Sequence, residues 1–156
     1  MSETYIEAPE IVASSWLNSE RPLTLSELRG KVVLLHAFQM LCPGCLLQGT
    51  PQAAAAAECF ADEPFQAIGL HTVFEHHSVM NPDALKVFAR EFRLAFPIAV
   101  DQPAENSAVP VTMQKLGLQG TPSLVLIDKR GLIRFSRFGQ VSDMQLGGMI
   151  GQLLAE

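Results

Sequence analysis

Two cysteines, Cys42 and Cys45, are separated only by Pro43 and Gly44 in the stretch LCPGC. Side chains three positions apart on a helix share one face, and such thiols are close enough to form a disulfide. The thiolate is the reactive form of cysteine, and a helix N-terminus stabilises it. The spacing therefore predicts a working dithiol. Cys42 would be exposed and attack, and Cys45 would be shielded and release the mixed disulfide.

A metal site and an inert core pair are the other interpretations of these cysteines. A closed zinc site needs four ligands, and the sequence has no second C-x-x-C motif. The histidines His71, His76 and His77 lack the spacing of a zinc finger. We therefore assign no metal ligand.

The third cysteine, Cys59, follows the pair in the chain. On an unbroken helix it would lie about 21 Å from Cys45, whereas a disulfide needs Cα atoms within about 7 Å. We predict a partly buried helix residue, and a resolving or dimerising role is the less favoured alternative.

The elements around the cysteines follow from hydrophobic pattern and capping residues. Residues 31–38 are apolar on both faces, which is typical of a central strand. A helix should begin near Pro43, break at residues 49–51, and restart with Thr50 as its cap and continue to about residue 61. Downstream we expect strands at 65–73 and 96–101, helices at 81–94 and 111–116, a hairpin over 123–139 and a closing helix over 142–156. This order predicts a mixed sheet covered by helices on both faces.

Composition limits the class of protein. The chain has 156 residues, of which 48% are apolar and 17% charged, which suits a single globular domain. A net charge of −5 gives no basic footprint for nucleic acid. No signal peptide and no membrane-spanning stretch is visible, so we expect a cytoplasmic protein without a membrane partner.

A family resemblance rests on two motifs together. The strand VVLLHAF followed by CPGC and a helix, with GTPS before a later strand, resembles the thioredoxin-like superfamily. The similarity is to the TlpA/AlkylHP-reductase-like (redoxin) thiol-disulfide oxidoreductases, over about residues 16–154. It implies a three-layer α/β/α sandwich with a central mixed sheet. The corresponding domain covers residues 16–156, after an N-terminal extension of residues 1–15.

The resemblance also implies roles for individual residues. Cys42 matches the nucleophile and Cys45 the resolving cysteine. Thr121 and Pro122 match the cis-proline dipeptide that pairs with the substrate backbone. The partners would be protein thiols or disulfides, together with an upstream thiol reductant or oxidant, and no cofactor would be bound. The direction of electron flow stays open.

This sequence departs from the family pattern at three positions. Leu41 stands where an aromatic residue usually precedes the first cysteine. His36 stands where many thioredoxin-like proteins bury a carboxylate, which makes it a candidate proton shuttle for Cys45; a hydrogen-bonded core histidine is the alternative. Pro51 follows Cys42 by nine residues where the family has eight, which predicts a bulge in the helix.

Two other functions remain as alternatives. Peroxiredoxins of this fold resemble P-x-x-x-T-x-x-C, and the matching positions here are Leu35 and Gln39, so a thiol peroxidase has little support. The second alternative is a non-catalytic module for binding or metal delivery.

Overall fold

The computed structural model describes residues 3–156 and contains one six-stranded mixed sheet. The strands lie in the order β1-β4-β3-β2-β5-β6. Their bounds are Ala13–Leu17 (β1), Val32–Phe38 (β2), Phe65–His71 (β3), Ile98–Asp101 (β4), Ser123–Ile127 (β5) and Ile133–Phe138 (β6). β2, β3 and β4 run parallel, whereas β1, β5 and β6 pair antiparallel with their neighbours.

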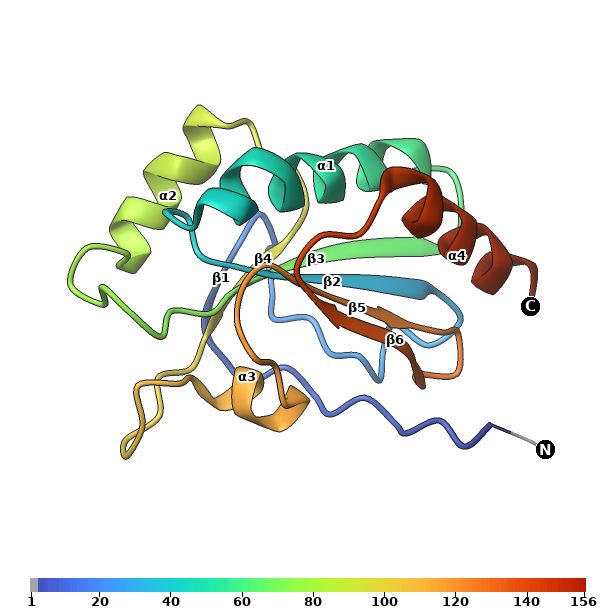
Figure 1. Cartoon of the computed structure of the whole chain (residues 1–156), viewed down its shortest axis with the longest axis horizontal. Helices are drawn as coiled ribbons and strands as arrows, with labels where there is room; N and C mark the ends of the chain where they lie inside the picture. Colours follow the sequence, from blue (N-terminus) through green and yellow to red (C-terminus); the bar gives the residue numbers. More distant parts are fainter. Residues whose placement is uncertain (1–2) are drawn as a thin grey trace.

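Helices cover the sheet on both faces, which confirms the predicted three-layer architecture. Their bounds are Thr50–Cys59 (α1), Pro82–Glu91 (α2), Val111–Leu116 (α3) and Asp143–Ala155 (α4). α1, α2 and α4 lie on one face, and the short α3 lies on the other (Figure 1). Asn81 and Ser142 cap α2 and α4 as predicted, since each side-chain oxygen accepts a backbone N–H of the first turn.

The central strand β2 positions the cysteines. All seven of its residues are buried, as its apolar character on both faces predicts. It pairs with β3 on one side and β5 on the other. β2 ends at Phe38, and Cys42 follows four residues later. The dithiol therefore sits at the edge of the most buried part of the fold.

The helix after the cysteines differs from the prediction of a break. A π-helical turn, Cys45–Gly49, leads directly into α1, and the N–H of Thr50 donates to the carbonyl of Cys45. Thr50 does not cap a new helix, because its backbone is already helical at φ −68° and ψ −46°. The wider π turn accommodates the extra residue before Pro51 and confirms the predicted bulge.

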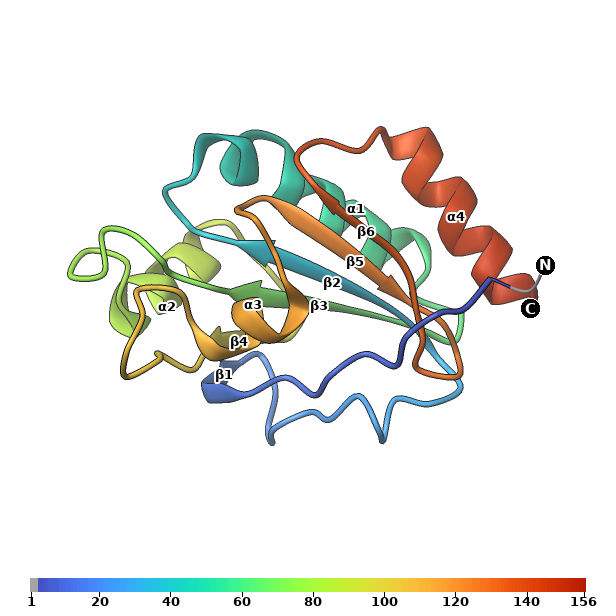
Figure 2. The same cartoon turned by 60° about the horizontal axis from the view of Figure 1, so that its bottom comes forward.

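The N-terminal segment packs against the sheet. β1 pairs with β4 at one edge, and the sequence does not predict this strand because ASSWL has no clear alternation. Earlier residues cross the α3 face of the sheet, where the N–H of Ala8 donates to the carbonyl of Gly131 (Figure 2). The predicted boundary between residues 15 and 16 falls inside β1.

Candidate active site

Cys42 and Cys45 differ in their exposure. Cys42 lies in the loop after β2 and is half-buried, whereas Cys45 begins the π-helical turn and is 0% exposed. Both are free thiols. A partner molecule can reach the first sulfur and not the second, which is the arrangement that an attacking and a resolving cysteine require.

The loop that contains Thr121 and Pro122 lies against the cysteine pair. The Cys42 thiol donates to the carbonyl oxygen of Thr121 at 3.4 Å, and the Thr121–Pro122 peptide bond is cis. Two glycines of the cysteine segment pack on the proline ring. A β-carbon on Gly44 would lie 3.2 Å from Pro122 Cδ, and one on Gly49 would lie 3.2 Å from Pro122 Cβ. Tertiary packing thus joins segments that are almost 80 residues apart in sequence.

The surroundings of Cys45 favour its protonated form. Burial, followed by a hydrogen bond with Cys42, raises the pKa of the Cys45 thiol to about 12. Hydrogen bonds from the Gln39 backbone and the Thr121 side chain act in the opposite direction and lower this pKa. The Cys45 thiol is therefore protonated at physiological pH, and a thiolate there depends on groups that stabilise its charge.

His36 is buried in β2 beneath the π-helical turn. Its Nε2 is 3.0 Å from the hydroxyl of Thr50, its ring stacks on Phe38, and its Nδ1 has no hydrogen-bond partner in the described residues. Burial lowers the pKa of His36 to about 3, so the imidazole is neutral at physiological pH. Within residues 3–156 no hydrogen bond links it to Cys45.

Two further side chains hold the cysteine loop, and the sequence analysis did not assign them to the site. The buried Gln39 amide contacts Thr121, and His71 Nε2 accepts the N–H of Met40 at 3.2 Å. In the sequence pattern, Gln39 matches only the threonine position of the peroxiredoxin motif. The available signal was its place, as a polar residue directly after a fully buried strand.

Apolar side chains are exposed on both segments that form the site. Leu41 is 57% exposed and Leu47 is 79% exposed, on either side of the cysteine pair in sequence. Phe138 is 53% exposed, and its ring packs on Gly120, next to Thr121. Single exposed apolar residues are common on protein surfaces, whereas a contiguous group of them marks a surface that contacts another molecule.

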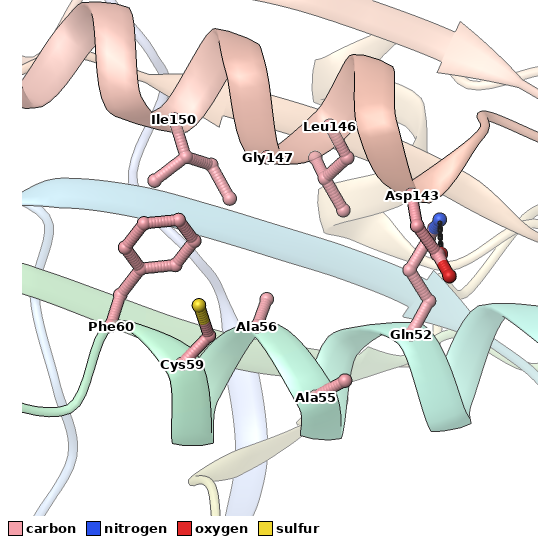
Figure 3. A pocket seen from close by; sticks show the side chains of 9 residues that line it. All are labelled: Gln52, Ala55, Ala56, Cys59, Phe60, Asp143, Leu146, Gly147 and Ile150. Atoms are coloured by element: carbon pink, nitrogen blue, oxygen red, sulfur yellow. Dashed lines mark hydrogen bonds between the residues drawn. The ribbon is translucent and has the colours of Figure 1, made fainter.

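Cys59 is not part of this site. It lies at the opposite end of α1 from Cys45 and is exposed, which corrects the prediction of partial burial. Its thiol faces a cavity of about 200 Å³ between α1 and α4, together with Phe60 and Ile150 (Figure 3). α4 contributes Leu146 and Ile150 to the lining of this cavity, and between them Gly147 leaves open space.

Residues 3–156 contain neither a cluster of metal ligands nor a membrane-spanning helix. No group of three or more His, Cys, Asp or Glu side chains there could hold a metal ion. In the same part of the chain, no helix is long and apolar enough to cross a membrane.

Comparison with known proteins identifies the family of this chain. The Redoxin family model matches residues 6–148. The chain belongs to the Redoxin family. As a redoxin it shares its fold with the crystal structure of a thioredoxin-like superfamily protein, at 49% identity and a TM-score of 0.93, over 96% of this chain and 97% of that one. The crystal structure of a thiol-disulfide isomerase from Corynebacterium glutamicum is 50% identical, with a TM-score of 0.90 over 96% and 97% of the two chains.

Curated relatives are more distant and much longer. Protein DipZ of Mycobacterium bovis is 29% identical over 150 residues, which is 94% of this chain and 20% of DipZ. Human NHL repeat-containing protein 2 is 28% identical over 128 residues, or 80% of this chain and 16% of that protein. The chain thus spans about a fifth or less of the length of these relatives.

Proposed function

We propose that this redoxin exchanges dithiol and disulfide with protein partners through Cys42 and Cys45. The observation that carries the proposal is the placement of a half-buried Cys42 thiol at the Thr121 carbonyl, with the fully buried Cys45 behind it. The solved relative described as a thiol-disulfide isomerase, at 50% identity, supports the same reaction class.

The reaction follows from the different exposure of the two sulfurs. In the reducing direction, the Cys42 thiolate attacks one sulfur of a partner disulfide, and the other sulfur leaves as a thiolate. Cys45 then gives up its proton and attacks the Cys42 sulfur of the mixed disulfide. The bond between Cys42 and the partner breaks, the second partner thiolate takes up the proton, and a Cys42–Cys45 disulfide forms. In the oxidising direction the same steps run in reverse.

Other residues of the site would serve this cycle. The Thr121 backbone and Pro122 would receive an extended segment of the partner beside Cys42. His36 is a candidate acceptor for the Cys45 proton because its Nδ1 has no hydrogen-bond partner in the described residues. Burial, which lowers the pKa of His36 to about 3, opposes this role. No bound cofactor takes part, and electrons pass to or from another thiol protein or a reductase.

A trapping experiment tests the exchange reaction. Replacing Cys45→Ser removes the resolving sulfur, so mixed disulfides on Cys42 should accumulate and separate on non-reducing gels. The double variant Cys42→Ser, Cys45→Ser retains Cys59 and is the matched control. If both variants gave the same species, or neither gave any, the exchange role of Cys42 would be refuted.

The direction of electron flow depends on the reduction potential of the Cys42–Cys45 couple. A redox titration giving a value near about −270 mV would indicate a reductant, and one near about −120 mV an oxidant. The cytoplasmic location predicted from the sequence is consistent with a reductant, and cell fractionation tests it.

A further inference from the structure

The side chain of Gln39 joins three segments around the dithiol. Gln39 directly follows β2, lies three residues before Cys42 and is only 1% exposed. Its Oε1 accepts the N–H of Phe74, in the loop after β3, at 3.2 Å. Its Nε2 donates to the hydroxyl oxygen of Thr121, also at 3.2 Å. One buried amide therefore connects the cysteine loop, the β3 loop and the loop that contains Pro122.

These contacts determine the direction of each hydrogen bond. The backbone N–H of Phe74 can only donate, so the amide oxygen of Gln39 must face it. The amide nitrogen then faces Thr121, and the Thr121 hydroxyl must accept. The hydroxyl keeps its own proton for a different acceptor. The Cys45 sulfur is the acceptor that the site offers. It lies beside Cys42, whose thiol donates to the Thr121 carbonyl at 3.4 Å, and the Thr121 side chain favours its thiolate form.

We propose that Gln39 is a positioning residue that directs the Thr121 hydroxyl proton toward the sulfur of Cys45. The inference rests on the proposed exchange reaction and concerns its second step. When Cys45 gives up its proton and attacks the Cys42 sulfur, Thr121 donates to the Cys45 sulfur while this sulfur is negatively charged. Aligned hydrogen bonds strengthen one another in a buried site, so the Phe74 N–H and the Gln39 amide support this donation.

The test separates the two steps of exchange by stopped-flow with dithiobis(nitrobenzoate). The reagent releases one thionitrobenzoate when Cys42 attacks and a second when Cys45 resolves the mixed disulfide. Background reaction is removed by working in a Cys59→Ser chain. The rate of attack by Cys42 and the rate of resolution by Cys45 are then measured separately on the same protein.

Two replacements of Gln39 change the network differently. Gln39→Glu has nearly the same shape and still accepts from Phe74, but its carboxylate attracts the Thr121 hydroxyl proton away from Cys45. Gln39→Leu removes both hydrogen bonds. Each should slow the second release about tenfold, the size expected for a lost hydrogen bond to a charged group, and change the first by less than about twofold.

Controls separate positioning from general loosening of the fold. Gln52 is another buried amide, bound to the Val141 carbonyl and to Asp143, each at 2.7 Å. Gln52→Leu should lower the unfolding temperature and change neither release rate. Combining Gln39→Leu with Thr121→Val should slow the second release no more than Thr121→Val alone, because both act through one hydroxyl.

Three outcomes would overturn the positioning role. These are equal slowing of both releases, no slowing in the well-folded Glu variant, and additive effects in the double variant. A failure of the proposed function looks different, because the unaltered dithiol would then release only one thionitrobenzoate per Cys42.

Discussion

A β-carbon on Gly49 would lie 2.7 Å from Cε1 of His36, so the π-helical turn and β2 are in direct contact beneath the dithiol. The same β-carbon would lie 3.2 Å from Pro122. Gly49 has an ordinary helical φ of −62°, so a larger residue is opposed by space and not by backbone conformation. Three parts of the candidate site meet at this glycine.

Gly49→Ala should therefore destabilise the fold. The added methyl group must displace the buried ring of His36, and overpacking of this kind costs about 1–3 kcal/mol. Gly148 in α4 is the matched control, since a β-carbon there meets nothing within 4 Å. Gly148→Ala should stabilise the protein by about 0.5–1 kcal/mol, because alanine is the better helix former. Urea unfolding measures both, and equal effects would contradict the packing explanation.

Protonation of His36 should make the fold sensitive to acid. Burial lowers its pKa from 6.5 to about 3 in the folded protein. Between these values the unfolded chain binds the extra proton, so stability is lost as the pH falls below about 6.5. The loss from His36 reaches about 2 kcal/mol at pH 5.

The variant His36→Gln tests this pH dependence, because glutamine does not titrate and still offers a partner to Thr50. The drop in unfolding free energy between pH 7 and pH 5 should be smaller in the variant by about 2 kcal/mol. His71, whose pKa burial lowers to about 4, keeps its own contribution in both proteins. If the unfolding free energy fell equally in the variant and in the unaltered protein, His36 would take up its proton as readily in the folded as in the unfolded chain.

His36→Leu separately tests the proton-acceptor role. If the imidazole takes the Cys45 proton, the second release of thionitrobenzoate should slow more than the first, by about tenfold or more. Equal slowing of the two releases would indicate that His36 only packs between β2 and the π-helical turn.

Replacing Leu41 should slow the reaction with a protein disulfide and leave the reaction with a small disulfide unchanged. It is 57% exposed, so Leu41→Asn should change the unfolding free energy by less than about 0.5 kcal/mol. Reaction with a protein disulfide such as insulin should slow several-fold, because an apolar contact beside Cys42 is lost. The reaction with dithiobis(nitrobenzoate) should stay unchanged. Equal slowing with both substrates would place the effect on the Cys42 thiol itself.

Cys59 should be open to alkylation in the folded protein, and replacing it should leave the reaction rates of Cys42 and Cys45 unchanged. Its thiol is exposed, so iodoacetamide should alkylate it in the folded protein even when Cys42 and Cys45 form a disulfide. Cys59→Ser should leave both thionitrobenzoate release rates unchanged. A loss of exchange in this variant would give Cys59 a role that its distance along α1 argues against.

The sequence by itself determined the elements that frame the dithiol. β2 is apolar on both faces, so it had to be central, and the capping residues Asn81 and Ser142 begin the helices that they predict. The bulge before Pro51 was predicted by the family resemblance, since Pro51 follows Cys42 by nine residues where the family has eight. These features depend on local periodicity and on contacts within a few residues, which a sequence displays directly.

Only the tertiary structure decided what surrounds the two sulfurs. The contact of Cys42 with Thr121, the bridge from Gln39 to Phe74 and the open side of Cys59 all depend on which segments meet across the sheet. The partners of Gln39 are 82 and 35 residues away, so no local pattern reveals them. Spacing in the sequence identified the two thiols, whereas long-range packing decides which is reached first and which groups stabilise the other.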